Sequence, residues 1–169
     1  MKLHPVDLKI MAPEIFRVFG TQNALLSAGG SDNCNTMTIG WCQLGTLWGK
    51  PVCTVYVRPE RYTYQLMESC DYFTVSVLPA DQKKIMGYCG SKSGRDTDKI
   101  KECGLTLRRG AGDAPFFDEA EWVLVCKKAY VQDLDPACVL EKDTALPFYQ
   151  EGGWHRAYTG IVLEAYAAR

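Results

Sequence analysis

Short segments rich in β-branched and aromatic residues recur along this chain at uneven intervals, and this pattern constrains the fold most. The clearest segment, residues 51–57 (PVCTVYV), combines both residue classes, which pack well on a pleated surface. The same reasoning predicts further strands over residues 24–28, 36–42, 72–78, 121–130 and 155–165. These segments lack the regular strand–helix alternation of a doubly wound fold. We therefore expect a mostly antiparallel β-barrel or sandwich.

Short helices are expected to pack on the outside of this sheet. Residues 13–20 begin with a proline and end with a glycine, which is typical of helix boundaries. The remaining predicted elements are helices over residues 62–69, 81–88 and 97–103, a turn at 29–33 and an irregular loop at 90–96. No internal repeat, low-complexity segment or long linker divides the sequence. Residues 1–169 are therefore predicted to form a single, mostly β domain with peripheral helices.

The overall charge and the distribution of apolar residues exclude several classes of protein. A formal net charge of −1 provides no basic face for nucleic acid. No apolar run reaches the roughly 18 residues that are needed to span a bilayer. The N-terminal stretch carries Asp7 and Lys9, unlike the apolar core of a signal peptide. We expect a cytoplasmic protein that binds neither nucleic acid nor membranes.

The chain contains eight cysteines but no C-x-x-C pair. Disulfide scaffolds are usually short and secreted, and this chain has enough apolar residues to fold without them. We interpret most of the cysteines as small buried apolar residues in a reducing compartment, and we predict no metal site. A cysteine-based metal or redox protein is the alternative, which elemental analysis would detect.

Residues 35–41 (NTMTIGW) form the first segment that is suited to a ligand. On a strand, Thr36 and Thr38 share one small, hydroxylated face, and Met37 lies on the opposite, apolar face. A flat polar heterocycle needs a close backbone, small neighbours and hydroxyl or amide partners, all of which this strand offers. An ordinary half-buried strand explains the same pattern.

Two further segments suit an anion. Arg58 and Arg61 bracket the start of the predicted helix at 62–69, where free backbone N–H groups and the Thr63 hydroxyl favour a phosphate. Residues 90–96 (GSKSGRD) combine glycines with serine, lysine and arginine donors, without the spacing of a Walker-type loop. Solvated surface arginines and a flexible loop are the alternative interpretations.

His155 is the only histidine outside the N-terminal segment, and it is the one candidate for acid–base chemistry. No G-x-S-x-G motif is present for it to serve in a Ser-His-Asp hydrolase. A His–Cys pair is compatible with the sequence, and so is a histidine at a strand edge that is satisfied by backbone groups. No residue is assigned a catalytic role.

These segments together resemble a known family. The runs N-T-M-T-I-G-W, L-G-T-L-W-G-K-P-V, V-R-P-E-R-Y-T-Y and Y-F-T-V-S-V-L-P are similar to the flavin reductase-like family. The runs G-Y-C-G-S-K-S-G-R-D-T-D-K and W-H-R-A-Y-T-G are similar to its flavoredoxin branch. The resemblance covers residues 22–165, and its specificity lies in the order and spacing of the runs. One departure is Gly40, where family members often carry a small hydroxylated residue, so no hydroxyl contact is expected there.

The resemblance implies a split β-barrel that binds FMN non-covalently in a groove near the interface of a homodimer. It places the isoalloxazine ring against Asn35, Thr36, Met37 and Thr38. It places the phosphate and ribityl chain at Arg58, Arg61 and Thr63. It closes the site with Ser91, Lys92 and Arg95, from the same or the partner subunit, and it puts His155 and Arg156 near the open face of the flavin.

The implied reaction is hydride transfer from NADH or NADPH to the flavin, followed by electron delivery to an acceptor. Donors such as Thr38 and Lys92 would stabilise the reduced flavin at its N1 and O2 edge. The G-x-G-x-x-G fingerprint of a dinucleotide-binding domain is missing, so a nicotinamide is expected to bind directly against the flavin. A non-enzymatic FMN-binding electron carrier on the same fold is the principal alternative.

Overall fold

A computed structural model describes residues 3–6 and 15–168. The helical segments are α1 (Ile15–Arg17), η1 (Val18–Gln22), α2 (Tyr62–Ser69), α3 (Lys83–Ser91), α4 (Lys99–Glu102), η2 (Ala111–Asp113), η3 (Pro136–Cys138), α5 (Lys142–Ala145) and η4 (Leu146–Phe148). The strands are β1 (Leu3–Pro5), β2 (Ala24–Gly29), β3 (Cys34–Ile39), β4 (Cys42–Leu47), β5 (Lys50–Val57), β6 (Tyr72–Val77), β7 (Leu107–Arg109), β8 (Pro115–Phe117), β9 (Trp122–Asp133) and β10 (Arg156–Ala168).

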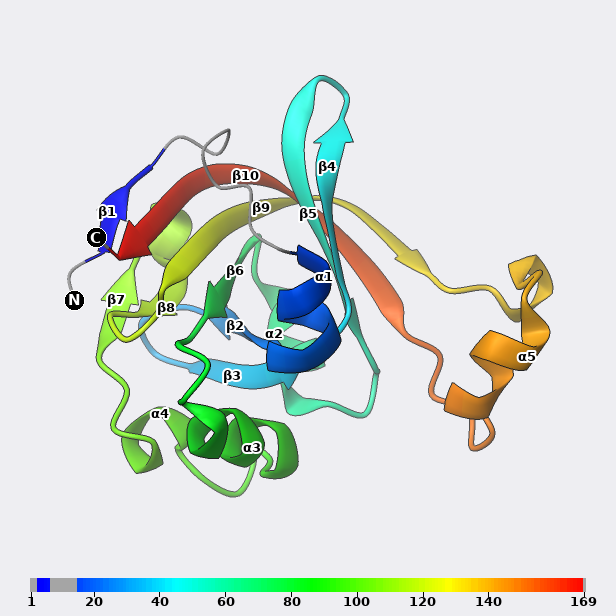
Figure 1. The fold of residues 1–169 in the computed structure, drawn as a ribbon, viewed down its shortest axis with the longest axis horizontal. Coiled ribbons are helices and arrows are strands. Elements are labelled where there is room, and N and C mark those ends of the chain that lie inside the picture. The colour runs from blue at the N-terminus through cyan, green and yellow to red at the C-terminus, as the bar shows by residue number, and fades with distance from the viewer. Residues whose placement is uncertain (1–2, 7–14, 169) are drawn as a thin grey trace.

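One curled antiparallel sheet dominates the molecule (Figure 1). Its strand order is β3-β2-β6-β9-β10-β5-β4, and β1 pairs with β10 at the side. A separate hairpin pairs β7 with β8. Helix α2 packs against β2 and β3, whereas α3 and α4 lie beneath β3 (Figure 1). The expectation of a mostly antiparallel β fold with peripheral helices is confirmed.

Both faces of the central strands are buried, which explains why these segments are so rich in apolar residues. On β2, Leu26 points into the core inside the barrel, while Leu25 points into a second core outside it. On β9, Leu124 and Val125 divide between the same two cores. The alternation follows from the two-residue period of a strand, and it leaves no face of β2 for solvent.

Some predicted elements differ from the observed ones at their ends. The predicted strand at 36–42 divides in two, because β3 ends at Ile39 and β4 begins at Cys42. Gly40 lies in the break, where a Cβ atom would come 2.8 Å from Asn23 Oδ1. The predicted helix at 62–69 has the observed bounds of α2. The predicted helix at 13–20 is described only from Ile15, since residues 13 and 14 lie outside the described ranges.

The sequence patterns did not predict the arm that projects from the barrel (Figure 1). Strands β9 and β10 continue past the barrel, and residues 134–155 join their far ends through η3, α5 and η4. Many side chains of this arm are exposed, including Leu140 and Phe148, so it lacks the apolar period of a packed helix. Hairpin β4–β5 also projects, and its turn places Trp48 and Gly49 at positive φ.

Candidate functional site

Three cavities meet at Thr38, near the end of β3. The first, of about 150 Å³, lies between the start of α2 and the loop after α3, and we call it the loop pocket. The second, of about 180 Å³, is bounded by His155, and we call it the histidine pocket. The third, of about 800 Å³, lies along α3, and we call it the α3 pocket. Thr38 lines all three cavities, so together they border one continuous stretch of β3.

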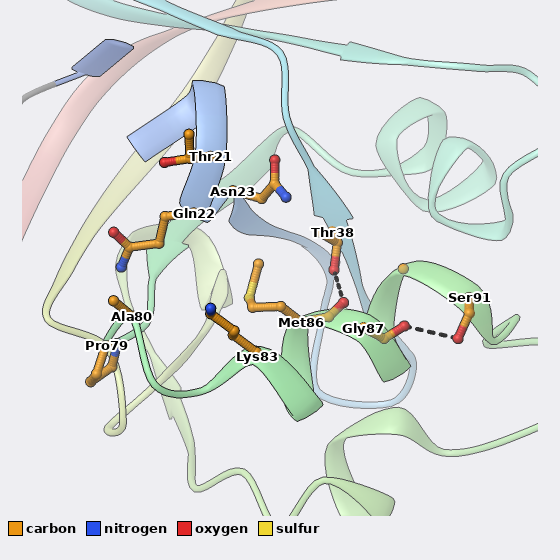
Figure 2. A pocket seen from close by; sticks show the side chains of 11 residues that line it. Thr21, Gln22, Asn23, Thr38, Pro79, Ala80, Lys83, Met86, Gly87 and Ser91 are labelled. Carbon is orange, nitrogen blue, oxygen red and sulfur yellow. Dashed lines mark hydrogen bonds between the residues drawn. The ribbon is translucent and has the colours of Figure 1, made fainter. Parts of the chain in front are cut away.

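Figure 2 shows the α3 pocket and the hydrogen bond between Thr38 and Met86, two residues that line it. The Thr38 hydroxyl donates to the carbonyl of Met86 over 2.6 Å and thereby ties β3 to α3. The Ser91 hydroxyl donates to the carbonyl of Gly87 at the end of the same helix. Gly90 lies against Thr38, where a Cβ atom would come 3.3 Å from the threonine side chain. Helix α3 therefore approaches β3 closely.

The loop pocket is built on a buried hydrogen bond between two predicted site residues. Asn35 Nδ2 donates to Thr63 Oγ1 over 2.9 Å, and these residues are only 5% and 1% exposed. This bond joins β3 to the first turn of α2. No side chain caps that turn, since the N-cap residue is Arg61. The Tyr64 N–H donates to the carbonyl of Arg61, whereas the N–H groups of Tyr62 and Thr63 have no side-chain cap and can face an anion.

Basic side chains outnumber acidic ones in the loop pocket. Its lining includes four cations, Arg61, Lys92, Arg95 and Lys99, and one carboxylate, Glu60. Arg95 donates to the carbonyl of Glu60 and lies over the ring of Tyr62 at 5.5 Å. The guanidinium is therefore held in place by backbone and ring contacts. The resulting excess of positive charge favours a phosphate or another anion.

Lys99 is the site residue that sequence reasoning missed. It is only 4% exposed, and its ammonium donates to the carbonyls of Thr36 and Cys89. Burial lowers the pKa of Lys99, and the nearby Arg61 adds to that shift. The Asp98 carboxylate caps α4, inside the predicted helix at 97–103, but a lysine at the next position of such a helix reads as a surface residue. Only the packing of α4 under β3 reveals its burial.

Gly94 allows the loop to approach β3 closely. A Cβ atom at this position would come 2.3 Å from Asn35 Oδ1 and 2.8 Å from the ring of Tyr62. The glycine-rich composition of residues 90–94 is therefore a packing requirement of the loop pocket. It brings the donors of the loop beside the strand that the sequence marked as a ligand surface.

The histidine pocket is aromatic. Trp41 lies 4.5 Å from the ring of His155, and Tyr56 lines the same cavity. The Tyr149 hydroxyl and His155 Nδ1 are 2.8 Å apart and share a hydrogen bond. Burial lowers the pKa of His155 to about 4, and the positive charges of Arg58 and Arg61 add to this shift. The imidazole is therefore neutral at neutral pH.

Most of the predicted site residues come together around these cavities. The residues that line the loop pocket or the histidine pocket are Asn35, Met37, Thr38, Arg58, Arg61, Thr63, Ser91, Lys92, Arg95 and His155. Arg58 lines the histidine pocket rather than the loop pocket, and it donates to the carbonyl of Phe148 on the arm. The sequence had grouped Arg58 with Arg61 at one phosphate site.

Two predicted site residues lie elsewhere. The Thr36 side chain is fully buried and hydrogen-bonded to Ser27 and to the carbonyl of Leu26, so its hydroxyl serves the core. The Arg156 guanidinium forms ion pairs with Asp133 and Glu68, beyond the lining of the three cavities. Thr36 shares its face of β3 with Thr38, but its hydroxyl meets Ser27 of β2, whereas the Thr38 hydroxyl meets the carbonyl of Met86 on α3.

Other functional classes gain no support from the part of the chain that the structure covers. In residues 3–6 and 15–168, no group of three or more His, Cys, Asp or Glu side chains could hold a metal ion. Within the same ranges, no helix has both the length and the apolar character needed to cross a membrane. All eight cysteines are free thiols, and three of them are buried.

Solved structures with the same fold include several flavoproteins. A flavoredoxin from Methanosarcina acetivorans has a TM-score of 0.70 at 21% identity, over 88% of this chain and 69% of that chain. An FMN-binding protein from Thermus thermophilus has a TM-score of 0.69 at 20% identity, over 87% and 71%. An NADH:FAD oxidoreductase from Streptomyces globisporus C-1027 has a TM-score of 0.66 at 22% identity, over 98% and 87%.

At these identities the structural likeness establishes the fold, and a sequence model establishes the family. A comparison with curated protein sequences finds no significant match. The model of the flavin reductase like domain, in contrast, matches residues 16–168. Since that match spans nearly the whole chain, from α1 to the end of β10, the protein belongs to the flavin reductase-like family and has its split β-barrel fold.

Proposed function

We propose that this protein binds FMN along β3 and acts as an NAD(P)H-dependent flavin oxidoreductase. The observation that carries the proposal is the loop pocket, where four cations and the uncapped start of α2 meet beside Thr38. A phosphate fits this donor set, because charge-assisted hydrogen bonds and helix N-termini both favour anions. The family and the FMN-binding proteins of the same fold support FMN as the ligand.

The residues of the loop pocket fit the polar half of FMN. Arg61 and Arg95 would hold the phosphate, with the backbone N–H groups of Tyr62 and Thr63 at the start of α2. Thr63 would contact the ribityl chain through a hydroxyl that already accepts a hydrogen bond from Asn35. The ring would lie along β3 near Met37 and Thr38, where the three cavities meet.

When bound, FMN supplies the hydride acceptor that the protein itself lacks. Lys92 and backbone N–H groups of the loop would stabilise negative charge on the reduced ring. Trp41 and Tyr56 provide an aromatic surface beside the ring, against which a nicotinamide would stack. His155 contacts Trp41 and shares a hydrogen bond with Tyr149, so its role there would be to position these two rings.

We further propose that the protein is a cytoplasmic homodimer. The arm and hairpin β4–β5 leave large apolar side chains in solvent, notably Trp48, Leu140 and Phe148. Such exposed side chains are typical of surfaces that another chain covers. The free cysteines are compatible with a reducing compartment.

The second candidate function is an FMN-binding electron carrier that exchanges electrons only with protein partners. Flavoredoxins from Methanosarcina acetivorans and Desulfovibrio vulgaris share the fold, which favours this alternative. The chemistry of the loop pocket is the same for both candidates. They differ in whether a nicotinamide reaches the ring beside Trp41.

Anaerobic reduction of the FMN-loaded protein separates the two candidates. We expect FMN to bind with quenching of its fluorescence, and NADH or NADPH to bleach the flavin absorbance within seconds to minutes. A flavin that stays oxidised with both donors, but is reduced by dithionite, would identify a carrier. A protein that neither carries nor binds FMN would contradict both candidates.

A further inference from the structure

Two cysteines flank the segment 92–98, which joins α3 to α4 and lines the loop pocket. Cys89 lies in the last turn of α3, and Cys103 caps α4. Their sulfur atoms are 3.9 Å apart, although 14 residues separate them along the chain. Both are free thiols, and helices α3 and α4 lie next to each other beneath β3 (Figure 1).

This pair is coupled to the loop pocket through Cys89. Cys89 lines the pocket, and its carbonyl accepts a hydrogen bond of 2.8 Å from the Lys99 ammonium. The next residue, Gly90, packs against Thr38. A displacement of Cys89 would therefore move the side of the loop pocket formed by residues 89 and 90. It would also move the carbonyl that accepts the hydrogen bond of Lys99.

We propose that Cys89 and Cys103 are an oxidisable dithiol, and that their disulfide lowers the affinity of the loop pocket for FMN. The second half of this inference rests on the proposed function, whereas the first half does not. A disulfide requires a sulfur–sulfur distance of about 2.05 Å. Closing the gap of 3.9 Å draws the ends of α3 and α4 together and strains the contacts of Gly90 and Lys99.

The oxidant in this proposal is hydrogen peroxide. One thiol sulfur attacks the peroxide, the O–O bond breaks, and a sulfenic acid and one water form. The second thiol attacks that sulfur, the S–O bond breaks, and a second water leaves as the disulfide forms. Two thiols thus lose two electrons and two protons, and one peroxide becomes two waters.

The environment of the two thiols sets the order of attack. Cys103 is partly exposed, so the peroxide reaches it first, whereas Cys89 is 1% exposed and acts second. Burial raises the pKa of Cys89 to about 12, and the adjacent Cys103 contributes to this shift. The thiolate that attacks the sulfenic acid is therefore scarce at neutral pH, and cross-linking should accelerate as the pH rises.

A second close pair, Cys42 and Cys53, provides an internal comparison. Their sulfur atoms are 3.5 Å apart, but both residues lie in the hairpin β4–β5, where Cys42 pairs with Val55 and Cys53 with Leu44. Cys53 is fully buried, and the ladder of hydrogen bonds holds the register of both strands. Cys89 and Cys103, in contrast, lie at the ends of two different helices, α3 and α4, and no strand ladder joins them.

Peptide mapping tests the cross-link without any flavin. Trypsin separates Cys89, on residues 85–92, from Cys103, on residues 102–108. After mild peroxide treatment, these two peptides should appear joined, with the mass of two hydrogen atoms lost. The cross-link should form faster at pH 9 than at pH 7. Oxidation of the exposed Cys138 without a joined 85–92/102–108 peptide would overturn the proposal.

FMN titration tests the consequence. We expect the oxidised protein to bind FMN about tenfold more weakly than the reduced protein, and dithiothreitol to restore the affinity. Cys103→Ser should bind FMN normally and become insensitive to peroxide, whereas Cys138→Ser should behave like the wild type. A cross-linked protein with unchanged FMN affinity would overturn the coupling. Failure of the reduced protein to bind FMN would instead contradict the proposed function, and the cross-link would stand independently.

Discussion

The loop pocket and the histidine pocket lie on either side of Thr38, yet they are built on different physical principles. In the loop pocket, polar groups are fixed by backbone contacts, as with Arg95 on Glu60 and Lys99 on Thr36. In the histidine pocket, rings pack on rings around the neutral imidazole of His155, and Arg58 and Arg61 supply the pocket's charge. Charged groups therefore dominate the loop pocket, whereas aromatic rings flank the cations of the histidine pocket.

The largest expected effect comes from removing charge at the loop pocket. Replacing Arg61 and Arg95 together by alanine should weaken FMN binding about 100-fold, or roughly 2.7 kcal/mol, and riboflavin binding much less. Only FMN carries the phosphate that these guanidinium groups would contact. Parallel fluorescence titrations with the two flavins measure the difference.

Arg58→Ala is the control for the charge experiment. Arg58 lines the histidine pocket, so its loss should not separate FMN from riboflavin. If Arg58→Ala discriminated between the two flavins as strongly as the double variant, the division between the two pockets would be wrong.

The second prediction concerns the shape of the loop pocket. Gly94→Ala should destabilise the protein by about 1–3 kcal/mol and weaken FMN, because the new Cβ overlaps Asn35 and Tyr62. Gly45→Ala offers a matched control, since nothing lies within 4 Å of a Cβ there. Thermal unfolding of both variants checks the prediction, and equal melting temperatures would refute it.

The third prediction concerns the contribution of the buried Lys99 charge to FMN binding. Lys99→Met keeps the volume of the side chain but removes a buried charge whose burial is costly. FMN affinity should fall about tenfold, roughly 1.4 kcal/mol, while riboflavin affinity changes less. Lys101→Met, on the exposed face of the same helix, should change neither. If Lys99→Met preferred FMN over riboflavin as strongly as the wild type does, the Lys99 charge would not contribute to phosphate binding.

The smallest expected effect is a pH dependence at the histidine pocket. The pKa of His155 is about 4 in the folded protein, below its ordinary value, so only the unfolded chain gains a proton as the pH falls towards 4. The stability contributed by His155 is therefore present above pH 6.5 and is lost between about pH 6.5 and pH 4.

His155→Asn tests this dependence. The variant should lose about 1 kcal/mol less stability than the wild type between pH 7 and pH 4, after allowing for solvent screening. Urea unfolding at both pH values gives the comparison. An identical loss in the two proteins would mean that His155 does not titrate in this range.

Sequence patterns predicted the barrel strands well because two buried faces leave a continuous apolar segment such as residues 122–126 of β9. The short hairpin of β7 and β8 and the exposed arm were missed, since neither has a long apolar period. Candidate site residues were predicted where polar groups interrupt apolar segments. Lys99 was missed, and the contact of Arg58 with the arm was not foreseen, because burial and pairing across the chain depend on tertiary contacts.

The arm has a mechanical consequence for the site. Arg58 donates to the carbonyl of Phe148, and the ring of Phe148 lies 5.2 Å from that of Trp41. Both contacts join the arm to residues that line the histidine pocket, Arg58 and Trp41. A partner that binds the arm would therefore also act on the surface where we propose that a nicotinamide stacks. In the proposed function, the electron donor would enter beside a part of the chain that lies outside the barrel.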